Sequence, residues 1–334
     1  MKYSTMTILS LTLLAGTAQA SPTSYLLSGT GTTSTYKNGY APSVVKAISP
    51  ITEEALFGKT ENRDGGGTLD NITGCAAETE SLCFGLGQGN VVAASDEVAN
   101  GKVCVVRSDL EPEFTFLFSN GQIDEWGTVR KNWAAGRVAL VTSAESSGSK
   151  ATAQDIIAAS EDLANAPVEE LENWDAVVAA VKDNPRKIGF THRYADPSGF
   201  LNDLGDDHDL NVFGLAEKGL RDVKHADGAD VYTVDRAPYN MSKRTLSVES
   251  AISMATPVVL FGNCASTLTN EGDREFLDKV HADIAALPAE SFAVDLGAIT
   301  NFVNKHVQRD KESSTGLWSH FDSIVSGGKE LLPE

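Results

Sequence analysis

The chain has 334 residues, of which 41% are hydrophobic, and a formal net charge of −19. An electrostatic field of that sign repels nucleic acid and anionic lipid headgroups, so the composition argues against both as partners. The length is enough for two ordinary domains, and the apolar content is enough for a substantial core.

The first twenty residues have the features of a cleaved export signal. Lys2 gives a positive start, and the apolar stretch from Met6 to Leu14 is too short to span a bilayer. Ala18-Gln19-Ala20 then has the small-x-small pattern that signal peptidase reads. We therefore expect residues 1–20 to be a signal peptide and the mature protein to be periplasmic, with Ser21 as its first residue.

In chain order, strand-like and helix-like segments alternate. We predict buried strands at 25–27, 82–92, 102–106, 114–118, 137–141, 187–190 and 253–261, and helices that include 44–51, 150–163, 177–181, 276–287 and 296–303. This alternation predicts an α/β fold in which mainly parallel sheets are flanked by helices. Ligands of such sheets bind beyond the carboxyl ends of the strands, so the loops at those ends are the candidate sites.

Three such loops carry groups suited to a small anion. Ser28 to Thr35 is rich in hydroxyls and free backbone amides and lies close to a predicted helix N-terminus, although a flexible loop is the alternative. Ser143 to Ser149 offers several serines, and Ser149 is expected to cap the helix from Lys150. Phe84 to Asn90 contains Gln88, which can both donate and accept hydrogen bonds, although a tight glycine-rich turn is an equal alternative.

A further candidate follows the strand that ends at Phe190. Thr191 and Arg193 would lie on the ligand-facing end of the sheet, and Arg193 could hold a carboxylate through two parallel hydrogen bonds. Three other arginines remain open as alternatives: Arg107, Arg130 and Arg236.

The four cysteines form an even set, as expected for disulfides in an oxidising compartment. Their spacing shows no zinc pattern, so we expect no metal site. Cys75 and Cys83 flank one polar turn, while Cys104 lies in a predicted strand and Cys264 directly follows another. This placement favours the bridges 75–83 and 104–264, although spacing leaves the connectivity open.

Enzyme signatures are weak. Ser147-Gly148-Ser149-Lys150 matches the S-x-x-K of penicillin-recognising enzymes, but no K-T-G follows it. The sequence shows no Ser-His-Asp order, Walker loop or G-x-G-x-x-G, so we expect neither catalysis nor a cofactor. The acidic run at 206–209, which includes His208, is read as a solvated turn rather than a metal site.

Taken in order, these segments resemble the TAXI family, the type II periplasmic binding proteins of TRAP-type transporters. Gly29 to Thr33 is similar to the family's G-T-G-G-T-Y-like loop, and Leu86 to Asn90 is similar to its strand ending in I-V-Q-S-D. Gly136 to Ser149 follows its G-K-R-V and G-S-G-T-like stretch. Tyr239 and the strand from Ala255 to Phe261 are similar to the family's return into the first lobe.

The resemblance implies two α/β lobes joined by crossing strands, with the ligand enclosed between them. We expect residues 21–112 and 233–334 to form the first lobe and residues 113–232 the second. The resemblance also implies that the ligand is a small carboxylate such as glutamate or a keto-dicarboxylate. It implies a membrane permease as partner, and we expect the protein to be a monomer. The ligand set carried over is Thr30, Thr32, Thr33, Gln88, Ser147 and Ser149; placement alone adds Ser146, Thr191 and Arg193.

Other functions remain open at this point. An ABC-type protein that binds phosphate, sulfonate or another oxyanion would use the same hydroxyls and amides. A secreted hydrolase would use Ser147 as nucleophile beside Lys150. A sensor or adhesin could be built on the same two lobes.

Overall fold

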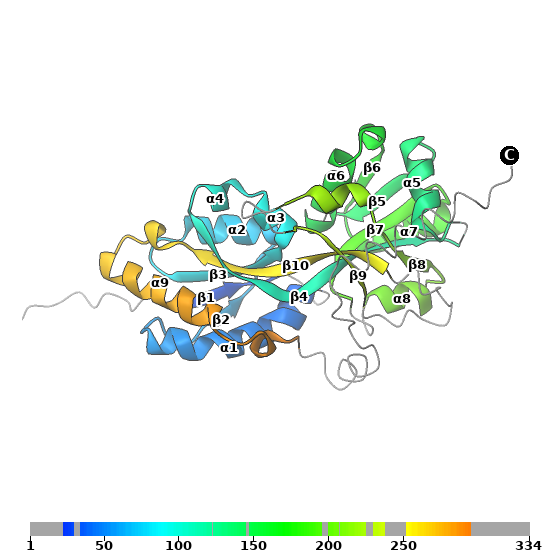
Figure 1. Ribbon diagram of the computed structural model, residues 1–334. Coiled ribbons are helices and arrows are strands. Elements are labelled where there is room, and N and C mark those ends of the chain that lie inside the picture. Colours follow the sequence, from blue (N-terminus) through cyan, green and yellow to red (C-terminus); the bar gives the residue numbers. More distant parts are fainter. Residues whose placement is uncertain are drawn as a thin grey trace, which may run out of the picture.

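In a computed structural model the chain folds into two lobes joined by two long strands (Figure 1). The structure describes residues 23–29, 34–121, 123–144, 147–195, 200–206, 208–224, 230–237 and 252–294. The expected signal peptide and the helix expected at 296–303 lie outside these residues. Within the described part of the chain, no helix combines the length and apolarity needed to cross a bilayer.

The first lobe contains the strands β1 (Ser24–Leu27), β2 (Glu61–Arg63) and β3 (Leu82–Gln88), with the helices α1 (Ala41–Glu54), α2 (Thr68–Ala77), α3 (Gly89–Ala93), α4 (Asp96–Ala99) and α9 (Glu271–Ala285). The second lobe contains β5 (Ala139–Ser143), β6 (Val168–Leu171), β7 (Lys187–Arg193), β8 (Asn211–Gly214) and β9 (Thr233–Arg236), with α5 (Trp126–Ala134), α6 (Ser147–Ala158), α7 (Trp174–Asp183) and α8 (Phe200–Asp206). Short helical turns lie at Tyr36–Tyr40, Glu161–Leu163, Lys218–Asp222, Ala265–Thr267 and Ala289–Phe292.

Two strands serve both lobes. β4 (Val103–Ser119) pairs with β10 (Ile252–Asn263) through its first part and with β7 and β8 through its last residues. β10 in turn pairs with β9 at its start and with β3 near its end. The result is one continuous sheet in the order β2-β1-β3-β10-β4-β7-β5-β6.

The two lobes repeat one arrangement of strands. In the first lobe the order is β2-β1-β3-β10-β4, and β10 runs antiparallel to both of its neighbours. In the second lobe the order is β6-β5-β7-β4-β8, and β4 is the antiparallel member. Each lobe is thus mainly parallel and is completed by one long strand that also serves the other lobe. The structure confirms the predicted two-lobed α/β fold.

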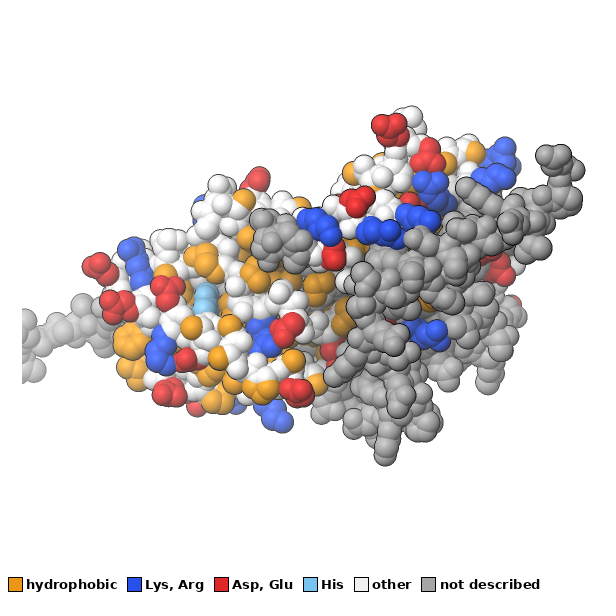
Figure 2. All heavy atoms as spheres, viewed as in Figure 1, with side chains coloured by type: hydrophobic (Ala, Val, Ile, Leu, Met, Phe, Trp, Pro, Cys, Tyr) orange, Lys and Arg blue, Asp and Glu red, His pale blue; other side chains and the backbone are white. Residues whose placement is uncertain are grey.

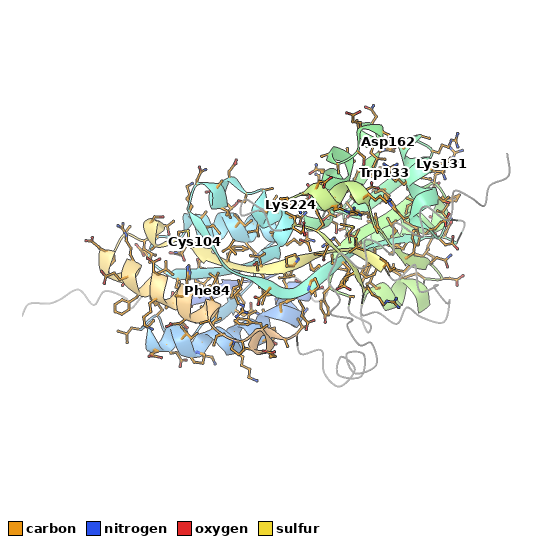
Figure 3. All side chains as sticks on the ribbon, viewed as in Figure 1. Phe84, Cys104, Lys131, Trp133, Asp162 and Lys224 are labelled. Atoms are coloured by element: carbon orange, nitrogen blue, oxygen red, sulfur yellow. A yellow bond between two sulfur atoms is a disulfide. The ribbon has the colours of Figure 1, made fainter. Side chains whose placement is uncertain are left out.

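Each lobe has a hydrophobic layer on either side of its sheet. In the first lobe, Phe84 packs in the layer that contains α1 and α9, whereas Cys83 faces α2 and α3. In the second lobe, Trp133 packs in the layer that contains α5 and α6, whereas Val177 packs with α7 and α8. Figure 3 labels Phe84 and Trp133, one in each lobe. This alternation follows from the two-residue period of side chains along a strand.

The structure contains both expected disulfides. Cys75 is bonded to Cys83 and ties α2 to β3, and Cys104 is bonded to Cys264 and ties the start of β4 to the end of β10. The second bridge closes a sequence separation of 160 residues.

Several predicted boundaries were wrong. The strands expected at 102–106 and 114–118 are one strand, β4, and the strand expected at 82–92 ends at Gln88, where α3 begins. α6 begins at Ser147, so Ser149 lies inside the helix rather than capping it. The strand expected at 253–261 lies within β10, which continues through Pro257 because its register with β4 shifts there and no regular ladder bond needs the missing N–H of proline.

Candidate solute-binding site

Gln88 lies at the junction of the two lobes. It is the last residue of β3, and its side chain is 2% exposed. The Gln88 side chain lies against Gly148, in the first turn of α6. A Cβ atom added to Gly148 would be only 1.4 Å from Gln88 Oε1. Neither amide atom of Gln88 has a hydrogen-bond partner among the described residues. A buried carboxamide without partners is costly, and its position at a helix N-terminus favours a polar ligand there.

The start of α6 is fixed to the end of β7. The Oγ atom of Ser149 accepts a hydrogen bond from the backbone N–H of His192, at 2.9 Å. His192 Nδ1 is 2.8 Å from the Thr115 hydroxyl, which lies on β4. Burial lowers the pKa of His192 to about 3, so the ring is neutral at pH 7. Its Nε2 has no partner among the described residues and adds a second unpaired polar atom to this junction.

A buried carboxyl group lies beside Gln88. Glu113 of β4 is 4% exposed, and the Tyr36 hydroxyl donates a hydrogen bond to its Oε2 at 3.1 Å. Burial raises the pKa of Glu113 to about 8, even though the hydrogen bond from Tyr36, the charge of Arg193 and the nearby Gln88 amide act in the opposite direction. No geometrically ideal bond joins Gln88 to Glu113, but the two groups are close enough for the amide to lower this pKa. Gln88 of the first lobe and Arg193 of the second lobe are therefore both close enough to the Glu113 carboxyl group to affect its pKa.

Arg193 is held by its own strand and by two aromatic rings. Its Nε donates a hydrogen bond to the Thr191 hydroxyl at 3.0 Å. The guanidinium carbon lies 4.0 Å from the ring centroid of Phe200 and 4.8 Å from that of Trp174. Thr191 is fully buried, and its hydroxyl positions the arginine. A stacked, oriented guanidinium suits the recognition of a planar carboxylate.

Two more buried polar atoms without a hydrogen-bond partner among the described residues lie at the carboxyl ends of strands: Oδ1 of Asn90, at the start of α3, and Oγ1 of Thr142, near the end of β5. Figure 2 shows the molecular outline hollowed between the lobes, on the side where α3 and α6 face each other in Figure 1. Parallel strands of both lobes thus direct polar groups to the junction, as expected for sheets of this kind.

The structure brings together four of the residues expected at the site: Gln88, Ser149, Thr191 and Arg193. Thr30, Thr32, Thr33 and Ser146 lie outside the described residues, as does the side chain of Ser147. Glu113 and Tyr36 were not among the residues expected at the site, and Asn90 was expected only as the end of the candidate loop from Phe84. Glu113 lies between two predicted strands, in a segment for which no element was predicted.

Two of the alternative arginines are committed elsewhere. Arg107 forms a two-point ion pair with Asp109 and donates to backbone carbonyls at the end of α9. Arg130 bonds to Glu217 at 2.8 Å and to Asp162 at 2.9 Å. Both interactions hold a single lobe together, away from Gln88.

The structure gives little support to the hydrolase or metal alternatives. The Lys150 ammonium is half exposed and pairs with Glu170 at 3.0 Å, whereas a lysine general base is ordinarily buried. Among the described residues, no group of three or more His, Cys, Asp and Glu side chains is placed to hold a metal ion.

The sequence matches no family model and no curated protein. Several solved structures have a similar arrangement at very low sequence identity. A Xanthomonas citri protein bound to ATP has a TM-score of 0.44 at 12% identity, over 90% of this chain and 99% of its own. An R. palustris protein with adipate has a TM-score of 0.43 at 10% identity, over 93% and 96%. An ancestral arginine-binding protein bound to glutamine has a TM-score of 0.40 at 10% identity, over 78% and 91%. Because each of these TM-scores is below 0.5, the matches do not assign this chain to a family.

Proposed function

We propose that the chain is an extracytoplasmic solute-binding protein that encloses a small anionic solute between its lobes and has no catalytic activity. The observation that supports this most is Gln88, a buried carboxamide with no hydrogen-bond partner in the described part of the chain, placed against the N-terminal turn of a helix in the opposite lobe. Among the described residues, buried polar atoms of Asn90, Thr142 and His192 also lack a hydrogen-bond partner, and both Asn90 and His192 are bonded to α6. Such a set of groups can replace the hydration of a polar solute when water is excluded.

The proposed solute is a carboxylate, such as glutamate or a keto-dicarboxylate, delivered to the permease of a TRAP-type transporter. The stacked guanidinium of Arg193 and the amides at the start of α6 are the groups that would neutralise it, locally and against the overall charge of −19. The sequence-derived set of Thr30, Thr32, Thr33, Gln88, Ser146, Ser147, Ser149, Thr191 and Arg193 remains the proposed ligand shell.

We also propose that the two lobes hinge where β4 and β10 pass between them, and that they divide the chain into residues 21–112 with 233–334 and residues 113–232, except that β9 and the start of β10 belong to the second lobe. Val234 and Met254 pack in the core of the second lobe, so β9 and the start of β10 lie on that side of the hinge. The two disulfides fit an oxidising compartment. Intact-mass measurement of periplasmic material should show loss of residues 1–20, and a retained leader would contradict export by a signal peptide.

A thermal-shift panel tests the function. Dicarboxylates, amino acids, phosphate and sulfonates are added to the mature protein, and a ligand at a hundredfold excess over its Kd should stabilise it by about 2.7 kcal/mol. Gln88→Ala should abolish most of that shift, whereas Gln154→Ala, an exposed change of the same kind on α6, should retain it. A response to phosphate or sulfonates alone would favour the ABC-type oxyanion alternative. A full response of Gln88→Ala would show that the site lies elsewhere.

A further inference from the structure

One face of α6 contacts the first lobe along its length. Residues 148, 151, 152 and 155 are spaced by three, four and seven positions, so they form a single stripe on the helix. Gly148 lies against Gln88, and Ala151 packs with the apolar layer of the first lobe that contains Val91 and Val92. We call this stripe, together with Gln88 and Asn90, the closing face.

Hydrogen bonds join the lobes across the closing face. Asn90 Nδ2 of the first lobe is 3.0 Å from Asp155 Oδ2 and 3.4 Å from the Thr152 hydroxyl, both on α6 of the second lobe. The Tyr232 hydroxyl, which belongs to the core side of the second lobe, donates to the same oxygen of Asp155. Asp155 is therefore oriented from within its own lobe to receive Asn90 from the other.

The composition of the closing face suits a contact that opens and closes. Its members are a glycine, an alanine and short polar side chains, so separation of the lobes would expose little apolar surface. A Cβ on residue 148 would overlap the Gln88 carboxamide, so any other residue there would force the Gln88 side chain to move while the lobes are in contact. The open state carries no such restriction, since the overlap exists only when the lobes meet.

We propose that the closing face is a latch that holds the two lobes together before any solute is bound, with Asn90 and Asp155 as its bond and Gly148 as the residue that permits contact. This goes beyond solute binding, because it assigns the resting protein a closed conformation. A hydrogen bond to a charged group is strong enough for its loss to change the closed-to-open ratio by about tenfold or more. Removing the latch should therefore convert a mainly closed population into a mainly open one.

The test measures the distance between the lobes without added solute. Spin labels are attached at the exposed positions Ala99→Cys, at the end of α4, and Glu161→Cys, after α6, in the mature, disulfide-bonded protein. Double electron–electron resonance should give one short distance for the unmodified latch. Asn90→Ala, which removes only the bonds between lobes, should shift most of the distribution to longer distances.

Matched variants separate a latch from a general loss of structure. Asn132→Ala removes an asparagine hydrogen bond that stays inside the second lobe, from its Nδ2 to the Thr128 carbonyl of α5, and should leave the distance unchanged. Gly148→Ala should lengthen it, and Gln88→Ala combined with Gly148→Ala should shorten it again by removing the overlap. Circular dichroism confirms that each variant is folded.

A long distance in the unmodified protein, or a short one in Asn90→Ala, would each overturn the proposal. Because no solute is present, either result leaves the proposed function to be judged by its own assay.

Discussion

The ring of Phe261 in β10 lies directly over Gly85 in β3, its partner across the strand pair, and a Cβ on residue 85 would come within 2.3 Å of the ring. The second lobe contains the same relationship. There Phe118 of β4 lies over its partner Gly189 of β7, and a Cβ on residue 189 would come within 2.1 Å. In both lobes the strand shared with the other lobe supplies the aromatic ring.

We predict that Gly85→Ala and Gly189→Ala each destabilise the protein, because a methyl group would overpack a fully buried ring, which costs about 1–3 kcal/mol. Gly127 is the matched control. It lies inside α5 with no atom within 4 Å of an added Cβ, so Gly127→Ala should stabilise by about 0.5–1 kcal/mol. Urea denaturation measures all three, and equal effects would contradict the packing account.

Glu113→Gln should stabilise the protein increasingly as the pH rises. The carboxyl ionises near pH 4.5 when unfolded, but burial raises its folded pKa to about 8, so the folded state holds a proton that the unfolded state has lost. Stability therefore falls between these two values as pH rises, and glutamine removes this penalty. We expect a gain of at least about 1 kcal/mol at pH 8 relative to pH 5.

Thermal unfolding at pH 5 and pH 8 measures this gain. Glu53→Gln, an exposed change on α1, should follow the unmodified protein at both pH values. A gain for Glu113→Gln that does not depend on pH would show that the carboxyl is already ionised in the folded protein.

His281 gives a pH effect in the opposite direction. Burial lowers the pKa of this α9 side chain to about 4, from about 6.5 in the unfolded chain. Between these values the unfolded state binds a proton that the folded state does not, so stability is lost as pH falls. His281→Gln should reduce this loss by up to about 3 kcal/mol between pH 7 and pH 4. Denaturant titrations at both pH values measure the free energy of unfolding, with His208→Gln as control. If His281→Gln lost as much stability between pH 7 and pH 4 as the unmodified protein, the result would contradict burial of a neutral ring.

The two disulfides should contribute unequally to stability. Cys104→Ala with Cys264→Ala opens a loop of 160 residues, which by chain entropy costs about 5 kcal/mol, whereas Cys75→Ala with Cys83→Ala opens a loop of 8 residues and costs about 2.5 kcal/mol. Guanidinium denaturation of the two double variants gives the comparison. A larger loss from the short loop would mean that packing at α2 and β3, rather than chain entropy, dominates.

Elements with a clear hydrophobic period could be predicted from the sequence. α9 is an example, because Leu277, Val280 and Ile284 recur at helical spacing and are buried together. The disulfides could also be anticipated, since each cysteine lies next to a recognisable strand or turn. The helical period and the short bridge are local signals, whereas the bridge between Cys104 and Cys264 was anticipated from the placement of each cysteine at a predicted strand.

The middle of β4 could not be predicted in the same way. Arg107, Asp109 and Glu113 make this segment read as a loop, but Arg107 and Glu113 bond to residues far along the chain, and Asp109 pairs with Arg107. Arg107 bonds to the end of α9, and Glu113 accepts from Tyr36. The role of Glu113 at the candidate site was missed for the same reason, because its neighbours are assembled only by the fold.

β4 and β10, the strands that both lobes share, also determine when the sheet of each lobe can be completed during synthesis or export of the chain. β3 has been synthesised once residue 88 appears, but its partner β10 does not begin until residue 252. Until then one side of β3 is an open edge with unpaired backbone groups, and such edges invite pairing with other chains. β10 also completes the β4 ladder in the first lobe, so this one strand closes two edges at once. A nascent chain that stops short of this strand is therefore exposed to aggregation, however well its earlier helices have formed.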